Sequence, residues 1–133
     1  MALKTGLRTL LLAESSITTL SPVVYVETVA QGIKPPYIVI SSTGHDPMKA
    51  LDGTTGMEET EIDIECVEYT DAEAEALAKA VSDYLKDYSG AAGASDTIDA
   101  VLWDSKTMFV GQEQDGKNLW RFNVQLSFTI FHH

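Results

Sequence analysis

A chain of 133 residues, 44% of them hydrophobic, has the length of one domain and enough apolar surface to bury a sizeable core. The length argues against two independent cores, and a wholly disordered chain is excluded. Twenty Asp and Glu residues against nine Lys and Arg give a formal net charge of −11. This charge argues against general binding to nucleic acids or anionic membranes, because basic side chains hold both. No segment approaches the roughly 20 apolar residues that span a bilayer.

The first predicted element is an amphipathic helix over residues 3–14, whose leucines recur at helical spacing. Residues 23–26 and 37–42 are rich in β-branched and aromatic side chains, which predicts two strands. The second strand begins after two prolines, which lack the backbone donor that a sheet uses. Because its first four residues are apolar on both faces, we expect an internal strand rather than an exposed edge.

A long segment at about residues 43–58 follows, with neither a helical nor a strand period. Its glycines and its proline predict a loop or arm, and loops of this length in compact domains are usually functional or mobile. Met48, Leu51 and Met57 give it more apolar side chains than a solvated loop requires. Two explanations stay open: these side chains pack locally over the sheet, or they pack against another subunit.

Residues 61–66 alternate acidic and apolar side chains, which predicts a half-buried strand. Like charges about 7 Å apart along a strand repel one another, and nothing within this strand compensates them. The acidic face is either a solvated surface that keeps the protein soluble or a functional acidic surface. The two faces divide as follows: Ile62, Ile64 and Cys66 point inward, and Glu61, Asp63 and Glu65 point outward.

The next element is a helix, because Thr70 and Glu73 stand at capping-box spacing. It is predicted to run to about Tyr88, with Gly90 as its stop, and its alanines permit close approach to a sheet. Acidic residues in its first turns favour the positive end of the helix. Its predicted core stripe consists of Leu77, Val81, Tyr84, Leu85 and Tyr88.

The remaining segments complete the predicted fold. Residues 90–95 are small and predict a linker, residues 98–103 predict a strand, and residues 111–118 predict a turn. The clearest element is the strand over residues 120–130, which alternates apolar and polar side chains without a break. The whole chain is therefore predicted as a single α+β domain, residues 1–133. Its mainly antiparallel sheet of about four to five strands packs against an N-terminal helix and a central Ala-rich helix.

Few residues offer catalytic chemistry. His45 and Asp46 could form an acid–base pair, but two adjacent residues in a polar turn do not make a site. Cys66 shares a face with two isoleucines, so we expect burial rather than a nucleophilic role. The sequence holds no phosphate-binding glycine motif and no His or Cys pair at metal-ligand spacing. We therefore predict no catalytic residue, no cofactor and no metal ion.

Five short sequence segments follow the Leu-rich N-terminal helix in a fixed order within residues 5–132. They are Pro36–Ile40, Leu51–Gly53, Ile62–Cys66, Glu73–Ala78 and Trp120–Phe122. In this order the sequence resembles the tail-completion or tail-terminator proteins of long-tailed bacteriophages, the small head-to-tail joining family. No single phrase is diagnostic, and the ordered set carries the resemblance.

The resemblance implies an α+β subunit that assembles into a hexameric ring. Such a ring sits on the tail tube protein, stops tube growth, and docks the tail onto the head connector or stopper protein. DNA passes through the bore without specific binding, and no membrane or cofactor is involved. The implied location is the virion, at the junction of tail and neck, after synthesis in the cytoplasm of the bacterial host.

Two candidate sites follow from combining this resemblance with the residue pattern. Glu61, Asp63 and Glu65 are candidates for an acidic face toward the bore or a docking surface. Met48, Leu51 and Met57 are candidates for an arm between subunits. A competing function from another class is an acidic DNA mimic that occupies a basic nucleic-acid-binding protein. A mimic would stay a monomer or dimer, whereas a tail terminator would form rings; an enzyme using His45 or Cys66 is the least supported alternative.

Overall fold

The computed structural model describes residues 2–21, 23–27, 36–50, 53–86, 88–92, 96–111 and 121–132, without the side chains of 2, 43–50, 53–58, 96, 99, 103–105, 107–111 and 121. Its elements are α1 (Ala2–Ala13), α2 (Ser15–Thr18), β1 (Val24–Val26), β2 (Tyr37–Ala50), β3 (Gly53–Glu68), α3 (Asp71–Leu85), β4 (Gly90–Ala92), β5 (Asp96–Gly111) and β6 (Arg121–His132). The strand order is β1-β2-β3-β6-β5-β4; β1 and β2 are parallel, and the other neighbours are antiparallel. The predicted α+β class is confirmed.

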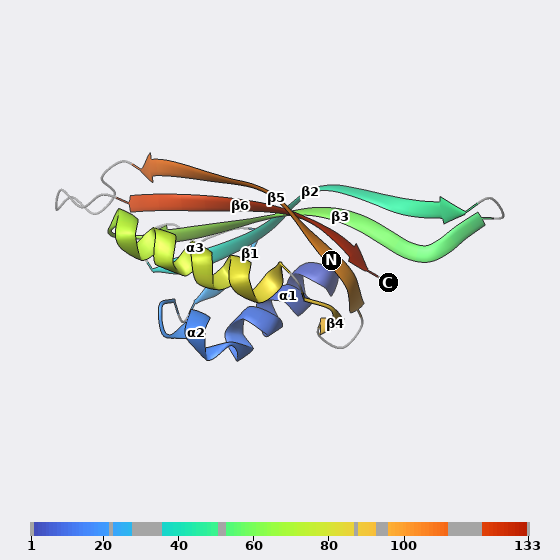
Figure 1. The fold of residues 1–133 in the computed structure, drawn as a ribbon, viewed down its shortest axis with the longest axis horizontal. Coiled ribbons are helices and arrows are strands. Elements are labelled where there is room, and N and C mark those ends of the chain that lie inside the picture. The colour runs from blue at the N-terminus through green and yellow to red at the C-terminus, as the bar shows by residue number, and fades with distance from the viewer. Residues whose placement is uncertain are drawn as a thin grey trace.

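The three helices lie on one face of the sheet, and the core fills the space between the two layers (Figure 1). Helix α1 contributes Leu3, Leu7 and Leu11 to this core, all fully buried, which confirms the predicted amphipathic helix. A strip of apolar side chains on α3 packs on the central strands of the same face. The sheet therefore has a helix-covered face and an opposite face, which we call the open face.

Strand β6 shows why alternation is a reliable signal. Val124, Leu126, Phe128 and Ile130 are buried against the helices, as period two predicts for one face of a strand. The strand lies in the interior of the sheet, between β3 and β5. Its polar side chains consequently fall on the open face, next to those of its two neighbours.

Helix α3 begins as predicted. The Thr70 hydroxyl accepts a hydrogen bond from the Glu73 backbone N–H at 3.2 Å and donates one to the Glu73 carboxylate at 2.8 Å. These bonds satisfy a backbone donor that the helix itself leaves free. The helix ends at Leu85, one turn before the predicted end. Tyr88 folds back instead, because its hydroxyl donates to the Ala91 carbonyl at 2.6 Å.

The arm at residues 43–58 is the main correction to the predicted elements. Its backbone forms a β-hairpin, in which β2 and β3 pair from Gly44 and Glu61 out to Ala50 and Gly53. Figure 1 shows this hairpin extending beyond the rest of the sheet. The sequence pattern failed here because the strands continue through backbone pairing, with glycines and Pro47 interrupting any alternation.

Smaller differences concern the second half of the chain. Residues 90–92 of the predicted linker form the short strand β4, which pairs with the start of β5. The sheet thus has six described strands, against the predicted four to five. Strand β5 runs from Asp96 to Gly111 and is much longer than residues 98–103. The predicted turn after Gly111 lies outside the described residues.

Helix α1 is locked in place by a close backbone approach and by two cations. A Cβ atom at Gly6 would stand 2.3 Å from the Ala92 carbonyl oxygen, so only glycine lets α1 touch β4. Lys4 is nearly buried; its ammonium pairs with the Glu27 carboxylate and donates to the Ser42 hydroxyl at 3.3 Å. Arg8 donates to the Val24 carbonyl at 2.9 Å, which ties α1 to β1.

Candidate functional site

The open face of the sheet carries the predicted carboxylates. Ile62, Ile64 and Cys66 of β3 are fully buried toward the helices. The intervening side chains Glu61, Asp63 and Glu65 therefore point to the open face, which no described helix covers (Figure 1). The predicted division of this strand into two faces is confirmed. The role of the three carboxylates stays a prediction, and together we call them the acidic ladder.

Two side chains of β6 donate hydrogen bonds to Asp63 and Glu65 of the acidic ladder. Asp63 stands opposite Ser127, whose hydroxyl donates to the Asp63 carboxylate at 2.8 Å. Asn123 lies diagonally across from Glu65, and its side-chain amide donates to that carboxylate at 2.5 Å. Both carboxylates are partly buried, whereas Glu61 is exposed. Cross-strand donors thus offset part of the repulsion within the ladder.

Burial also changes the pKa of one member of the acidic ladder, Glu65. Loss of water raises the pKa of Glu65 above its ordinary value, and the hydrogen bond from Asn123 opposes this rise. The side-chain oxygen of Asn123 is buried without a hydrogen-bond partner among the described residues. The position is therefore more tightly packed than a solvated surface.

Sequence reasoning missed the two donors, Asn123 and Ser127. The alternation of the last strand placed both on its polar face. Their pairing with the acidic strand depends on the register between β3 and β6, two strands separated by more than 50 residues. Period two reveals which residues share a face of one strand, but it does not reveal which strand lies beside it.

Apolar side chains also lie on the open face, near the base of the arm. Leu102 of β5 is 52% exposed, and it stands opposite Thr129 of β6. Phe131 of β6 is partly buried and pairs with Ala100, which is exposed. Exposed large apolar groups on a strand surface are typical of contact with another chain when they gather together.

The arm residues can be placed only in part. The backbones of Met48 and Met57 lie on β2 and β3 of the hairpin, while their side chains and the whole of Leu51 lie outside the described residues. The backbone therefore puts Met48 and Met57 on a segment that projects from the sheet. Their contact with another subunit stays a prediction.

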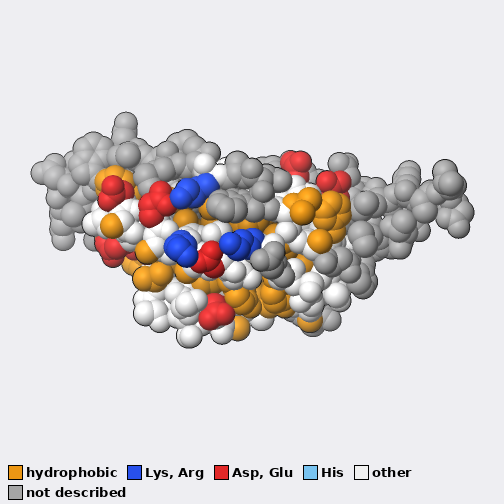
Figure 2. All heavy atoms as spheres, in the orientation of Figure 1, with side chains coloured by type: hydrophobic (Ala, Val, Ile, Leu, Met, Phe, Trp, Pro, Cys, Tyr) orange, Lys and Arg blue, Asp and Glu red, His pale blue; other side chains and the backbone are white. Residues whose placement is uncertain are grey.

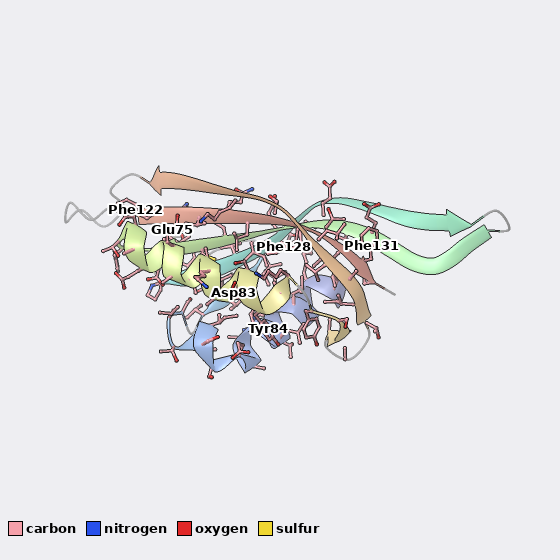
Figure 3. The ribbon with its side chains drawn as sticks, viewed as in Figure 1. Glu75, Asp83, Tyr84, Phe122, Phe128 and Phe131 are labelled. Atoms are coloured by element: carbon pink, nitrogen blue, oxygen red, sulfur yellow. The ribbon has the colours of Figure 1, made fainter. Side chains whose placement is uncertain are left out.

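A second surface lies on the helix-covered side, where α3 meets β5. A cavity of about 320 Å³ is bordered there by Glu75, Ala76, Ala78, Lys79, Ser82, Asp83 and Lys106. Its lysines are held by acids: Lys106 contacts Glu75 at 2.7 Å, and Lys79 contacts Asp83 at 2.6 Å. Figure 2 shows these opposite charges side by side over α3, and Figure 3 shows Glu75 and Asp83 along that helix. Paired charges of this kind favour a solvated helix surface over an anion site.

The Lys79 hydrogen bond lowers the pKa of Asp83, and the positive charges of Lys79 and Lys86 act in the same direction. These charges stabilise the ionised carboxylate on an exposed helix surface. An acid catalyst requires a carboxyl group held in its neutral form, and the neighbouring lysines favour the ionised form of Asp83 instead.

One buried acid was not among the residues that the sequence pattern predicted to be buried. Glu68, the last residue of β3, is 3% exposed and follows the inward face of that strand. Burial and the nearby Glu73 carboxylate raise the pKa of Glu68 to about 7 from 4.5. The end of β3 beside the start of α3 therefore holds a carboxyl group that titrates near neutral pH.

The residues considered for catalysis do not form a site. Cys66 is fully buried as predicted, and burial together with Glu68 and Glu65 raises the pKa of its thiol. The side chain of His45 lies outside the described residues. Across the described ranges, no three His, Cys, Asp or Glu side chains converge as metal ligands. None of the described helices has the length and apolar character needed to cross a membrane.

Comparison with known proteins identifies a family and related solved structures. The family model described as tail completion protein gp17 matches residues 5–130. Among solved structures, a chain from the virion of a native gene transfer agent particle is similar, with a TM-score of 0.65 and 16% sequence identity. The similarity covers 97% of this chain and 94% of that one, and at this identity it establishes a shared fold. No curated protein matches the sequence.

Proposed function

Because the chain belongs to the tail completion protein gp17 family, we propose that it forms a ring that caps the tail tube and joins the tail to the head connector. It is a structural protein of the phage tail and is located in the virion. In the proposed ring, six copies contact the tube protein on one side and the connector or stopper protein on the other. DNA crosses the bore without specific binding.

The acidic ladder on the open face supports this proposal most directly. A surface that carries Glu61, Asp63 and Glu65 repels the phosphates of DNA, so it suits a passage through which DNA slides. Six copies at −11 each carry a formal charge of −66. The arrangement of the sheet also favours this role, because the helices occupy one face and leave the acidic ladder uncovered.

The geometry gives less support to an acidic DNA mimic. A mimic needs carboxylates that are free to meet the basic side chains of its partner. Asp63 and Glu65 are instead partly buried and already accept hydrogen bonds from Ser127 and Asn123. Glu68 is buried on the opposite side of the strand. The acids of β3 therefore fit a fixed lining better than a surface shaped to imitate phosphates.

Neutralising the acidic ladder is expected to impair particle assembly or DNA passage while leaving the monomer folded. The variant combines Glu61→Gln, Asp63→Asn and Glu65→Gln, which remove charge but keep each side chain able to accept a hydrogen bond. We expect the yield of infectious particles to fall at least tenfold when the variant replaces the wild-type protein. Circular dichroism and thermal unfolding check that the fold is kept.

The matched control removes three charges from the helix-covered side, with Asp71→Asn, Glu75→Gln and Asp83→Asn on α3. This control has the same net charge as the ladder variant and should give a near wild-type yield. Equal yields from wild type, control and ladder variant would contradict a role for the acidic ladder. Equal losses in the two variants would show that only total charge matters.

The arm is proposed to contact a neighbouring subunit. Replacing Met48, Leu51 and Met57 by Ser should shift the protein from rings to monomers, because it removes the apolar side chains of the arm. Native mass spectrometry and size-exclusion chromatography measure this shift. A control with the same three positions as Leu should keep the ring. An unchanged oligomer in the Ser variant would count against the arm as an interface.

A further inference from the structure

The arm ends in a strand edge that no described strand covers. Strand β6 pairs with β3 only from Glu58 to Glu68, so the Gly53–Met57 segment of β3 continues past the end of β6. The other edge of the hairpin, on β2, is protected: Pro47 has no backbone donor, and the pairing shifts register on either side of it. The Gly53–Met57 segment contains no proline and keeps all its donors.

A second free edge lies on β5. Strand β4 pairs only with Asp96–Ile98, so residues 100–111 of β5 have no strand on their outer side among the described residues. In Figure 1 the arm reaches one end of the molecule, and β5 ends near the opposite one. Leu102, the most exposed large apolar side chain described, belongs to this edge strand.

Both edges require a partner for physical reasons. A projecting two-stranded hairpin is marginally stable by itself in water, and a long uncovered edge strand is a template for unwanted pairing. A second copy of this chain covers both, because each copy carries an arm edge at one end and a β5 edge that runs toward the opposite end.

We propose that the Gly53–Met57 edge of one copy adds as a strand to the free edge of β5, residues 100–111, in the next copy. Main-chain hydrogen bonds supply the contact, as in other cases of strand addition. The pairing is head-to-tail, so it continues from copy to copy and closes if the rotation between copies allows. It rests on the ring of the proposed function and states which backbone segments join its subunits.

This pairing is compatible with the acidic ladder as a lining. Strand addition at an edge extends a sheet within its own surface, so helices stay on one side and open faces on the other. The carboxylates of neighbouring copies would then form one continuous surface. A contact through the open face itself would instead bury the ladder against a neighbour.

Disulfide trapping tests the proposal on the full chain. Thr55→Cys lies in the middle of the arm edge, and Ala100→Cys and Thr107→Cys lie near the two ends of the β5 edge. Each β5 change is combined with Thr55→Cys in one chain and oxidised, and non-reducing gels are read. Thr107 lies in the half of β5 that runs away from the arm, so a disulfide between positions 55 and 107 links two copies (Figure 1). Ala100 lies across β6 from Glu59, near the base of the arm, so for that pair the mass of the crosslinked band distinguishes a link between copies from a link within one chain. The buried Cys66 of the wild-type chain provides the background control.

The expected result is a series of bands at multiples of 14.5 kDa with at least one double variant, and only the monomer band with each single variant. A disulfide dimer from Thr55→Cys alone would show symmetric pairing of two arms and overturn the proposal. Intact rings without crosslinks in either double variant would also overturn it while leaving the proposed function in place. A chain that stays monomeric in solution and in assembled particles would overturn both.

Discussion

Gly6→Ala is expected to destabilise the protein by about 3 kcal/mol, the upper part of the usual range for overpacking a tight contact. Intrinsic helix propensity predicts the opposite sign, a gain of about 1 kcal/mol for replacing Gly by Ala inside a helix. The clash decides the outcome, because the added methyl would meet the Ala92 carbonyl oxygen at 2.3 Å. Urea unfolding followed by circular dichroism measures the change in the free energy of unfolding.

Thr5→Ala is the matched control, since Thr5 is the preceding residue of α1 and is exposed. It should change the free energy of unfolding by less than about 0.5 kcal/mol. A Gly6→Ala variant as stable as wild type would show that α1 does not touch β4 in solution. That result would remove the contact between the N-terminal helix and the edge of the sheet.

Glu68→Gln is expected to stabilise the protein by about 2–3 kcal/mol at pH 8 and to have little effect near pH 4.5. The folded-state pKa of Glu68 is raised to about 7 from 4.5, so the folded state binds the proton more tightly than the unfolded state. Protonated Glu68 contributes to the stability of the wild-type protein below pH 4.5, and this contribution is lost as the pH rises from 4.5 through 7. The glutamine side chain does not titrate in this pH range, so the variant keeps its stability as the pH rises.

Thermal unfolding at several pH values checks the Glu68 prediction. Glu61→Gln makes the same chemical change at an exposed position of the same strand, and it should alter stability by less than about 0.5 kcal/mol at either pH. If Glu68→Gln were no more stable than wild type at pH 8, burial would not be raising the pKa of this carboxyl group.

Elements that bury one face were predicted well, because burial imposes a period on the sequence. Strand β6 and helix α1 were found from their alternation and their leucine spacing, and the start of α3 from the capping pair Thr70 and Glu73. These features depend on neighbours close in sequence or on one buried surface. Local physical chemistry is then sufficient to define them.

Elements held by strand pairing alone were missed. The arm has no buried face to impose a period, and its glycines and Pro47 suggested a loop although its backbone is a hairpin. The short strand β4 was missed for a similar reason, since its three small residues carry no alternation. In both cases the partner strand determines the conformation, and a partner is not visible in a single segment.

The acidic side chains of the candidate site were predicted from the sequence, but their hydrogen-bond partners were not. The sequence placed Glu61, Asp63 and Glu65 on one face of a strand, where the structure also has them. It did not reveal that Asn123 and Ser127 donate to two of these carboxylates, or that Glu68 is buried. Those facts depend on the β3–β6 register and on the packing of α3.

The position of β6 has a consequence for biosynthesis. This strand is the last of the six in chain order, yet it lies between β3 and β5. During synthesis, β3 and β5 therefore leave the ribosome before β6, the strand that pairs with both of them. Pairings between such distant segments close slowly, and unpaired strand edges invite aggregation in the interval. Acidic residues on β3 would keep nascent copies apart during that interval, because their like charges repel.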